Sequence, residues 1–161
     1  MIKNKNNYRS HWHCVYNLKY HLVLVTKYRR KCFTKPILKR LEEICRTQCS
    51  SWGIECLEFS GESDHVHLLL EMHPNIMPSK FVNSLKTVTS RYIRKEFSQH
   101  LSRFYWKPVL WTRAYCLISA GGAPLSVLKK YIQNQDSTPA WTLRAQRFPS
   151  PPKLRACSPV L

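Results

Sequence analysis

Two histidines with a single residue between them are the part of this sequence best suited to chemistry. His65 and His67 lie in residues 63–71, whose apolar run is typical of a buried strand. Because side chains alternate along a strand, both imidazoles project from one face, while Val66 and Leu68 project from the other. Two neutral imidazoles side by side suit a divalent metal, and a third ligand would leave positions open for a substrate phosphate. The spacing alone does not decide this, because surface histidines without ligands share it.

A second pair with the same spacing, His11 and His13, lies in a polar, Asn-rich N-terminal stretch. No buried apolar run follows this pair. We therefore interpret these two histidines as exposed or stacking side chains.

The charge balance points to a polyanionic partner. Lys and Arg number 26 against 9 Asp and Glu, a formal net charge of +17, and no acidic residue precedes Glu42. Each phosphate that such a surface neutralises releases a condensed counterion, which favours nucleic acid as the partner. The alternative is that the charge serves only solubility.

Cysteine usage and hydropathy indicate the compartment. The seven cysteines show no C-x-x-C spacing, so the sequence predicts neither a zinc ribbon nor a disulfide framework. We see no apolar run of membrane length and no signal-peptide pattern. We therefore expect a cytoplasmic protein with reduced thiols.

The elements that must position the histidines alternate between strands and helices. Apolar periodicity predicts strands at 20–26, 54–59, 65–71 and 110–118, and helices opened by Pro36 and by Pro78. The turn at 61–64 joins two of these strands into a hairpin. The order β-α-β-β-α-β predicts an α+β fold, the split βαβ (ferredoxin-like or RRM-like) antiparallel sheet with both helices on one face.

A further helix is predicted after Gly121 and Gly122. It runs from Pro124 to Gln135, and Tyr131 and Gln135, at i and i+4, share a face. We divide the chain into a basic N-terminal segment at 1–19, a main domain at 20–136, and a basic, Pro-rich tail at 137–161 that we expect to be disordered.

The ordered set of these features resembles a known family. His65-Val66-His67 on the third strand, Tyr131 and Gln135 on a later helix, and the opening 20–30, YHLVLVTKYRR, resemble the HUH-type single-tyrosine transposases of the insertion sequence 200/605 family. The resemblance implies a homodimer with shared active sites that excises and reinserts single-stranded DNA at the ends of a small insertion sequence and recognises subterminal hairpins. The tail after Asp136 does not match the family.

The same resemblance implies the roles of the site residues. Tyr131 would be the nucleophile, and His65, His67 and Gln135 would bind the metal. The family works with Mg²⁺. By ligand type, two imidazoles and a carboxamide favour Mn²⁺, Co²⁺ or Zn²⁺ over Mg²⁺, and we keep Mn²⁺ as the alternative. Attack by Tyr131 would give a 5′-phosphotyrosine and a free 3′-hydroxyl, and exchange of one phosphodiester for another needs no ATP.

Basic and aromatic residues are candidates for holding DNA. Two basic groups, one after the first strand and one along the second helix, could contact the DNA backbone or be ordinary solvated charges: Arg29, Arg30 and Lys31, and Lys86, Arg91 and Arg94. Tyr105, Trp106 and Trp111 could stack on bases, although we favour a core position for them.

Two rival functions remain at this point. One is a non-catalytic module that binds RNA or single strands on the same sheet. The other is an inactive transposase copy that only binds hairpins. Covalent capture of a DNA strand separates the enzyme from both.

Overall fold

The computed structural model describes residues 8–11 and 13–120. The predicted nucleophile helix, with Tyr131 and Gln135, and the tail at 137–161 lie outside these residues.

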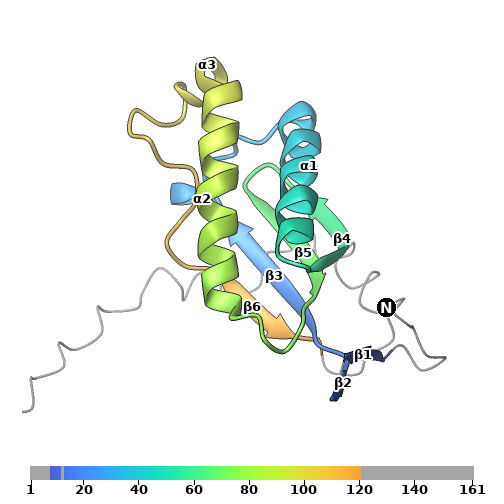
Figure 1. Cartoon of the computed structure of the whole chain (residues 1–161). Helices are drawn as coiled ribbons and strands as arrows, with labels where there is room; N and C mark the ends of the chain where they lie inside the picture. Colours follow the sequence, from blue (N-terminus) through green and yellow to red (C-terminus); the bar gives the residue numbers. More distant parts are fainter. Residues whose placement is uncertain (1–7, 12, 121–161) are drawn as a thin grey trace, which may run out of the picture.

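A four-stranded antiparallel sheet forms the centre of the fold (Figure 1). Its strands, in the sheet order β4-β5-β3-β6, are β4 (Glu55–Gly61), β5 (His65–Glu71), β3 (Lys19–Val25) and β6 (Cys116–Ser119). The long helices α1 (Lys35–Ser51) and α2 (Pro78–Glu96) cover one face of this sheet. The predicted split βαβ arrangement is confirmed.

The core lies between the sheet and the two helices. Leu22, Leu24 and Leu68 on the two central strands are completely buried, as is Phe81 on α2. Each such side chain contributes about 1.5–3 kcal/mol when fully buried. The apolar positions at every second residue of β5 face these helices, so the intervening positions, which include both histidines, face the other side of the sheet.

Both long helices begin close to where the prolines predicted. Pro36 lies in the first turn of α1, and Pro78 is the first residue of α2. Proline suits this position because its amide would have no partner in the helix. Gly53, two residues after the end of α1, has φ +67°, a conformation that glycine adopts without strain.

The predicted strand at 110–118 is wrong in extent. Only Cys116–Ser119 pairs as β6, and Trp111 forms one isolated bridge with Thr26. Between them, the carbonyl of Arg113 accepts a hydrogen bond of 2.8 Å from Lys86 on α2. A short helix, α3 (Ser98–Leu101), precedes this segment.

The N-terminal segment contains a hairpin that the sequence pattern did not predict. Strands β1 (Arg9–His11) and β2 (Cys14–Tyr16) pair with each other. Arg9 forms ion pairs with Glu55 on β4 and, at 2.9 Å, with the buried Glu71 on β5. These long-range ion pairs join the hairpin to the lower end of the sheet in Figure 1.

The six cysteines within the described part of the chain are all free thiols. Among the same residues, no helix combines the length and the apolar character needed to cross a membrane.

Candidate metal centre

The two histidines of β5 lie side by side on the face of the sheet opposite the helices. His65 is opposite Val25 of β3 and His67 is opposite Val23, in the central strand pair. Their ring centroids are 4.9 Å apart and their planes are nearly perpendicular. Both are buried, with 9% and 3% of their surface exposed. The prediction that they share one face is therefore confirmed.

His65 is oriented by the residue before it. Its Nδ1 lies 2.6 Å from Oδ1 of Asp64. A carboxylate only accepts, so Nδ1 must carry the hydrogen, which leaves the lone pair of His65 on Nε2. Burial would raise the pKa of Asp64, but hydrogen bonds from His65 and Arg29 outweigh it and the pKa is lowered. Asp64 is therefore an ionised carboxylate that fixes the tautomer of His65, an arrangement common behind metal-bound histidines.

Arg29 reaches Asp64 from a turn with an unusual backbone. Tyr28 and Arg29 have φ of 59° and 52°, values uncommon for residues other than glycine. Hydrogen bonds of the Lys27 amide to Leu110 and of the Arg29 amide to Thr26 hold this turn. From it, Nε and Nη2 of Arg29 both lie 3.0 Å from Oδ2 of Asp64. Arg29 therefore supports the histidine site and is not a freely exposed cation.

His67 is held from the neighbouring strand. Its Nδ1 lies 3.0 Å from Nε2 of His21, which is buried and stacked on it at a centroid distance of 5.2 Å. Burial first, and then the nearby His65 and His21, lower the pKa of His67 to about 3. His67 is therefore neutral near neutral pH. In the tautomer that carries its hydrogen on Nδ1, His67 donates to His21 and has a lone pair on Nε2.

The Nε2 atom of His67 is the observation that best fits a metal. It is buried and has no hydrogen-bond partner among the residues that the structure describes. A buried polar atom without a partner carries a desolvation cost that a folded protein rarely accepts. A metal bound to this lone pair would remove the cost, and His65 next to it offers a second imidazole nitrogen.

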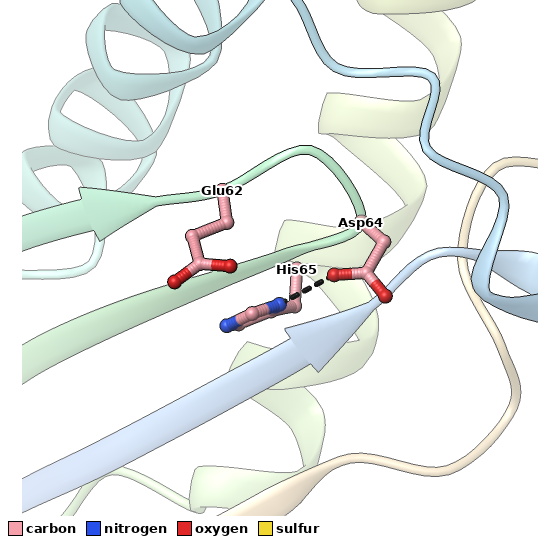
Figure 2. A group of neighbouring side chains, drawn as sticks. All are labelled: Glu62, Asp64 and His65. Carbon is pink, nitrogen blue, oxygen red and sulfur yellow. Dashed lines mark hydrogen bonds and ion pairs between the residues drawn. The ribbon is translucent and has the colours of Figure 1, made fainter. Parts of the chain in front are cut away.

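Two acidic residues complete the surroundings of His65. Donor atoms of Glu62, Asp64 and His65 all lie within 4.8 Å of one another. Figure 2 shows the Glu62 carboxylate beside the imidazole and Asp64 bonded to its other side. Both oxygens of Asp64 are already engaged by His65 and Arg29, so Glu62 is the carboxylate that remains for a metal. We did not predict Glu62 or Asp64 as part of the site from the sequence. A usable signal was present, because two of only nine acidic residues in the chain lie within three positions of His65.

Comparison with known proteins identifies the family. A family model described as "Transposase IS200 like" matches residues 14–135. The chain belongs to the IS200-like transposase family. The ISDra2 transposase TnpA of Deinococcus radiodurans is 31% identical over 121 residues, which are 75% of this chain and 86% of the relative. The transposase for insertion sequence element IS200 of Salmonella typhimurium is 31% identical over 76% of this chain and 80% of the relative.

A solved structure is similar to this IS200-like transposase over most of its length. A crystal structure from Deinococcus radiodurans R1, of a protein described as a candidate transposase, aligns with a TM-score of 0.65 and 30% identity. The alignment covers 81% of this chain and 99% of that one. Membership of the family implies DNA transposase activity and DNA binding.

The predicted DNA-binding residues of this IS200-like transposase occupy different environments. Arg30, Lys31 and Arg91 are exposed, and Arg94 is half-buried. Lys86 is half-buried and donates to the carbonyl of Arg113, and burial lowers its pKa. Their contact with DNA stays a prediction. The predicted Tyr131 and Gln135 lie outside the described residues, so the structure does not place them relative to His65 and His67.

The three candidate aromatic residues also differ in their burial. Trp111 and Tyr105 belong to the core, where the Trp111 indole donates to Thr89 at 2.9 Å. Trp106 does not, since 93% of its surface is exposed. Our expectation of a core position is therefore confirmed for two of these residues and is wrong for Trp106.

Proposed function

We propose that this IS200-like transposase cleaves and rejoins single-stranded DNA at the ends of a small insertion sequence, with Tyr131 as the nucleophile. The observation that carries the proposal is the buried Nε2 of His67, which has no hydrogen-bond partner among the described residues and lies next to His65 on a central strand. A purely structural histidine pair would satisfy both ring nitrogens. The net charge of +17 supports a polyanionic substrate.

His65, His67 and Gln135 would hold the metal, with Mg²⁺ as the ion and Mn²⁺ as the alternative. When bound, the ion polarises the scissile phosphate and stabilises its developing charge. Asp64 would keep the lone pair on Nε2 of His65 available to the metal, and His21 would do the same for His67. Glu62 supplies negative charge at the same edge and is the alternative third ligand.

Tyr131 attacks the phosphorus atom through its phenolic oxygen. A bond forms between this oxygen and phosphorus, and the phenolic O–H bond and the bond from phosphorus to the 3′ oxygen break. The 3′ oxygen takes up a proton in place of the one that the phenol loses. The 5′-phosphotyrosine keeps the energy of the phosphodiester, so a 3′-hydroxyl can attack it and release Tyr131. Rejoining is the same step in reverse and requires no nucleotide cofactor.

We propose subterminal DNA hairpins as the recognised element and a homodimer with shared active sites as the working form. The family resemblance supports both. Exposed cations at Arg30 and Lys31 are suited to phosphates along a hairpin stem.

Covalent capture tests the proposed function. The full-length protein is incubated with Mg²⁺ and labelled single strands from the DNA that flanks its gene, and the products are separated on a denaturing gel. We expect a shifted protein–DNA adduct with the single strand and none with the duplex, because only an unpaired strand exposes its phosphate to a tyrosine. Hairpin binding without any adduct would favour the non-catalytic binding module or the inactive copy.

A second prediction concerns His21. His21→Leu removes the acceptor for His67 Nδ1, so the hydrogen of His67 can move to Nε2 and block the lone pair. We expect Mn²⁺ affinity, measured by electron paramagnetic resonance of the free ion, to fall about 10- to 100-fold, as is typical when a residue behind a metal ligand is lost. His21→Gln keeps an acceptor and should remain close to wild type.

The matched control is His100→Leu. His100 is a half-buried histidine on α3 that donates a hydrogen bond of 2.9 Å to the carbonyl of Cys32 and lies on neither β3 nor β5. This variant should bind Mn²⁺ like the wild type. Unchanged Mn²⁺ affinity in His21→Leu would show that His21 does not orient His67.

A further inference from the structure

A basic groove lies at the C-terminal end of α2. Its volume is about 470 Å³, and it is lined by the last turns of α2, by α3 and by the loop that follows. None of its lining residues is acidic. Four of them are cations: Arg91, Arg94, Lys95 and Lys107.

The positive charge of this groove is not neutralised by its surroundings. The four cations form no ion pair with any acidic residue in 8–11 or 13–120. Glu96 follows Lys95 in the chain, but both of its carboxylate oxygens accept hydrogen bonds from Arg40 on α1, at 2.7 and 2.9 Å. The groove is therefore complementary to a polyanion.

Trp106 gives the groove an aromatic face. It is 93% exposed, more than any other large apolar side chain in the described residues. The ammonium of Lys107 lies 5.5 Å from its ring centroid. A flat indole beside cations is the combination that binds unpaired bases, because the ring stacks on the base while the cations contact the phosphates.

The loop that carries Trp106 is held in place. Tyr105, the preceding residue, is buried, its amide donates to the carbonyl of Leu101 at 2.9 Å, and its hydroxyl donates to the carbonyl of Lys27 at 2.8 Å. Lys27 begins the turn from which Arg29 reaches Asp64. These contacts connect the loop that lines the groove to the end of β3, where Val25 lies opposite His65.

We propose that this groove binds an unpaired segment of the DNA strand, with Trp106 stacking on a base and Arg91 and Lys107 contacting its phosphates. The proposal rests on the proposed function, since it assigns a second contact to the same single-stranded substrate. A duplex fits less well, because its bases are already stacked and its width exceeds one strand.

The test measures binding without chemistry. The probe is a fluorescent strand of about 15 thymidines, a length that matches typical single-strand sites. Its affinity for the full-length protein is measured by fluorescence anisotropy in a chelator, over a range of salt concentrations. We expect Trp106→Ala to weaken binding about 5- to 100-fold and Trp106→Phe, which keeps a stacking ring, to stay near wild type.

Charge is tested with a matched pair of double variants. Neutralising Arg91 and Lys107 with glutamine should flatten the plot of log affinity against log salt by about 1.4, at roughly 0.7 for each lost phosphate contact. The control neutralises Lys39 on α1 and Lys80 at the opposite end of α2, which are also exposed and lie outside the groove. In the control, the plot of log affinity against log salt should flatten less than in the variant that lacks Arg91 and Lys107.

Two results would overturn the proposal. One is wild-type affinity in Trp106→Ala. The other is a loss of affinity for a duplex of the same length in Trp106→Ala that is as large as the loss for the single strand. The proposed function fails separately, because it requires a covalent adduct and this binding test does not. Loss of strand affinity in Trp106→Ala would support the groove even if the wild-type protein formed no adduct.

Discussion

We expect Tyr131→Phe to abolish covalent capture of the DNA strand and to leave hairpin binding unchanged. The substitution removes one oxygen, the atom that would bond to phosphorus, and keeps the aromatic ring. We expect the rate of adduct formation to fall on the order of 10⁴-fold or more, as is typical when an enzyme loses its nucleophile. The measurement compares adduct yield on a denaturing gel with hairpin affinity by anisotropy in the same preparation.

Tyr92→Phe provides the control for this prediction. Tyr92 is exposed on α2, where Arg91 stacks on its ring at 5.4 Å, and the proposed reaction does not use it. This variant should form adduct at the wild-type rate. Adduct from Tyr131→Phe at wild-type yield would assign the nucleophile to another residue.

The second large effect is expected at the histidine pair. His65→Ala or His67→Ala removes an imidazole ligand from the proposed metal site, so Mn²⁺ affinity and cleavage should both fall about 100-fold or more. Hairpin affinity should change little, because the proposed phosphate contacts are made by cations elsewhere on the surface. Adding a chelator to the wild-type protein should have the same effect on cleavage.

Glu62→Gln separates the two possible ligand sets around His65. If His65 and His67 bind the metal, this variant should keep Mn²⁺ affinity within about tenfold of the wild type, since Glu62 then acts only through its charge. A loss as large as that of His67→Ala would place Glu62 in the metal shell. Undiminished cleavage in a chelator would contradict metal assistance altogether.

The fold was predictable where one periodicity governs a long segment. Alternation along 65–71 predicted which side chains face the helices, and Pro36 and Pro78 predicted where the helices begin. These signals are local, so they can be interpreted without knowledge of the tertiary structure. The β1–β2 hairpin was not predictable in this way, because its three-residue strands carry little pattern and Arg9 joins them to distant carboxylates.

The candidate site was predictable only in part, for a related reason. His65 and His67 share a face by the geometry of one strand. His21 meets His67 only because the register sets Val23 opposite His67 and puts His21 two residues along the neighbouring strand. Arg29 meets Asp64 through a turn with positive φ at residues other than glycine, which local preference does not favour. Such contacts depend on how separate strands and turns come together in the fold. Residue spacing within a single element does not predict them.

The central claim is that Tyr131 carries the DNA strand, and mass spectrometry of the trapped adduct tests it most directly. The wild-type protein is reacted with a single strand in Mg²⁺, denatured, treated with nuclease and trypsin, and the modified peptide is sequenced. We predict a nucleotide 5′-phosphate on Tyr131 and on no other tyrosine. A 5′-phosphate on the exposed Tyr28, or modification of any residue other than Tyr131, would contradict the account.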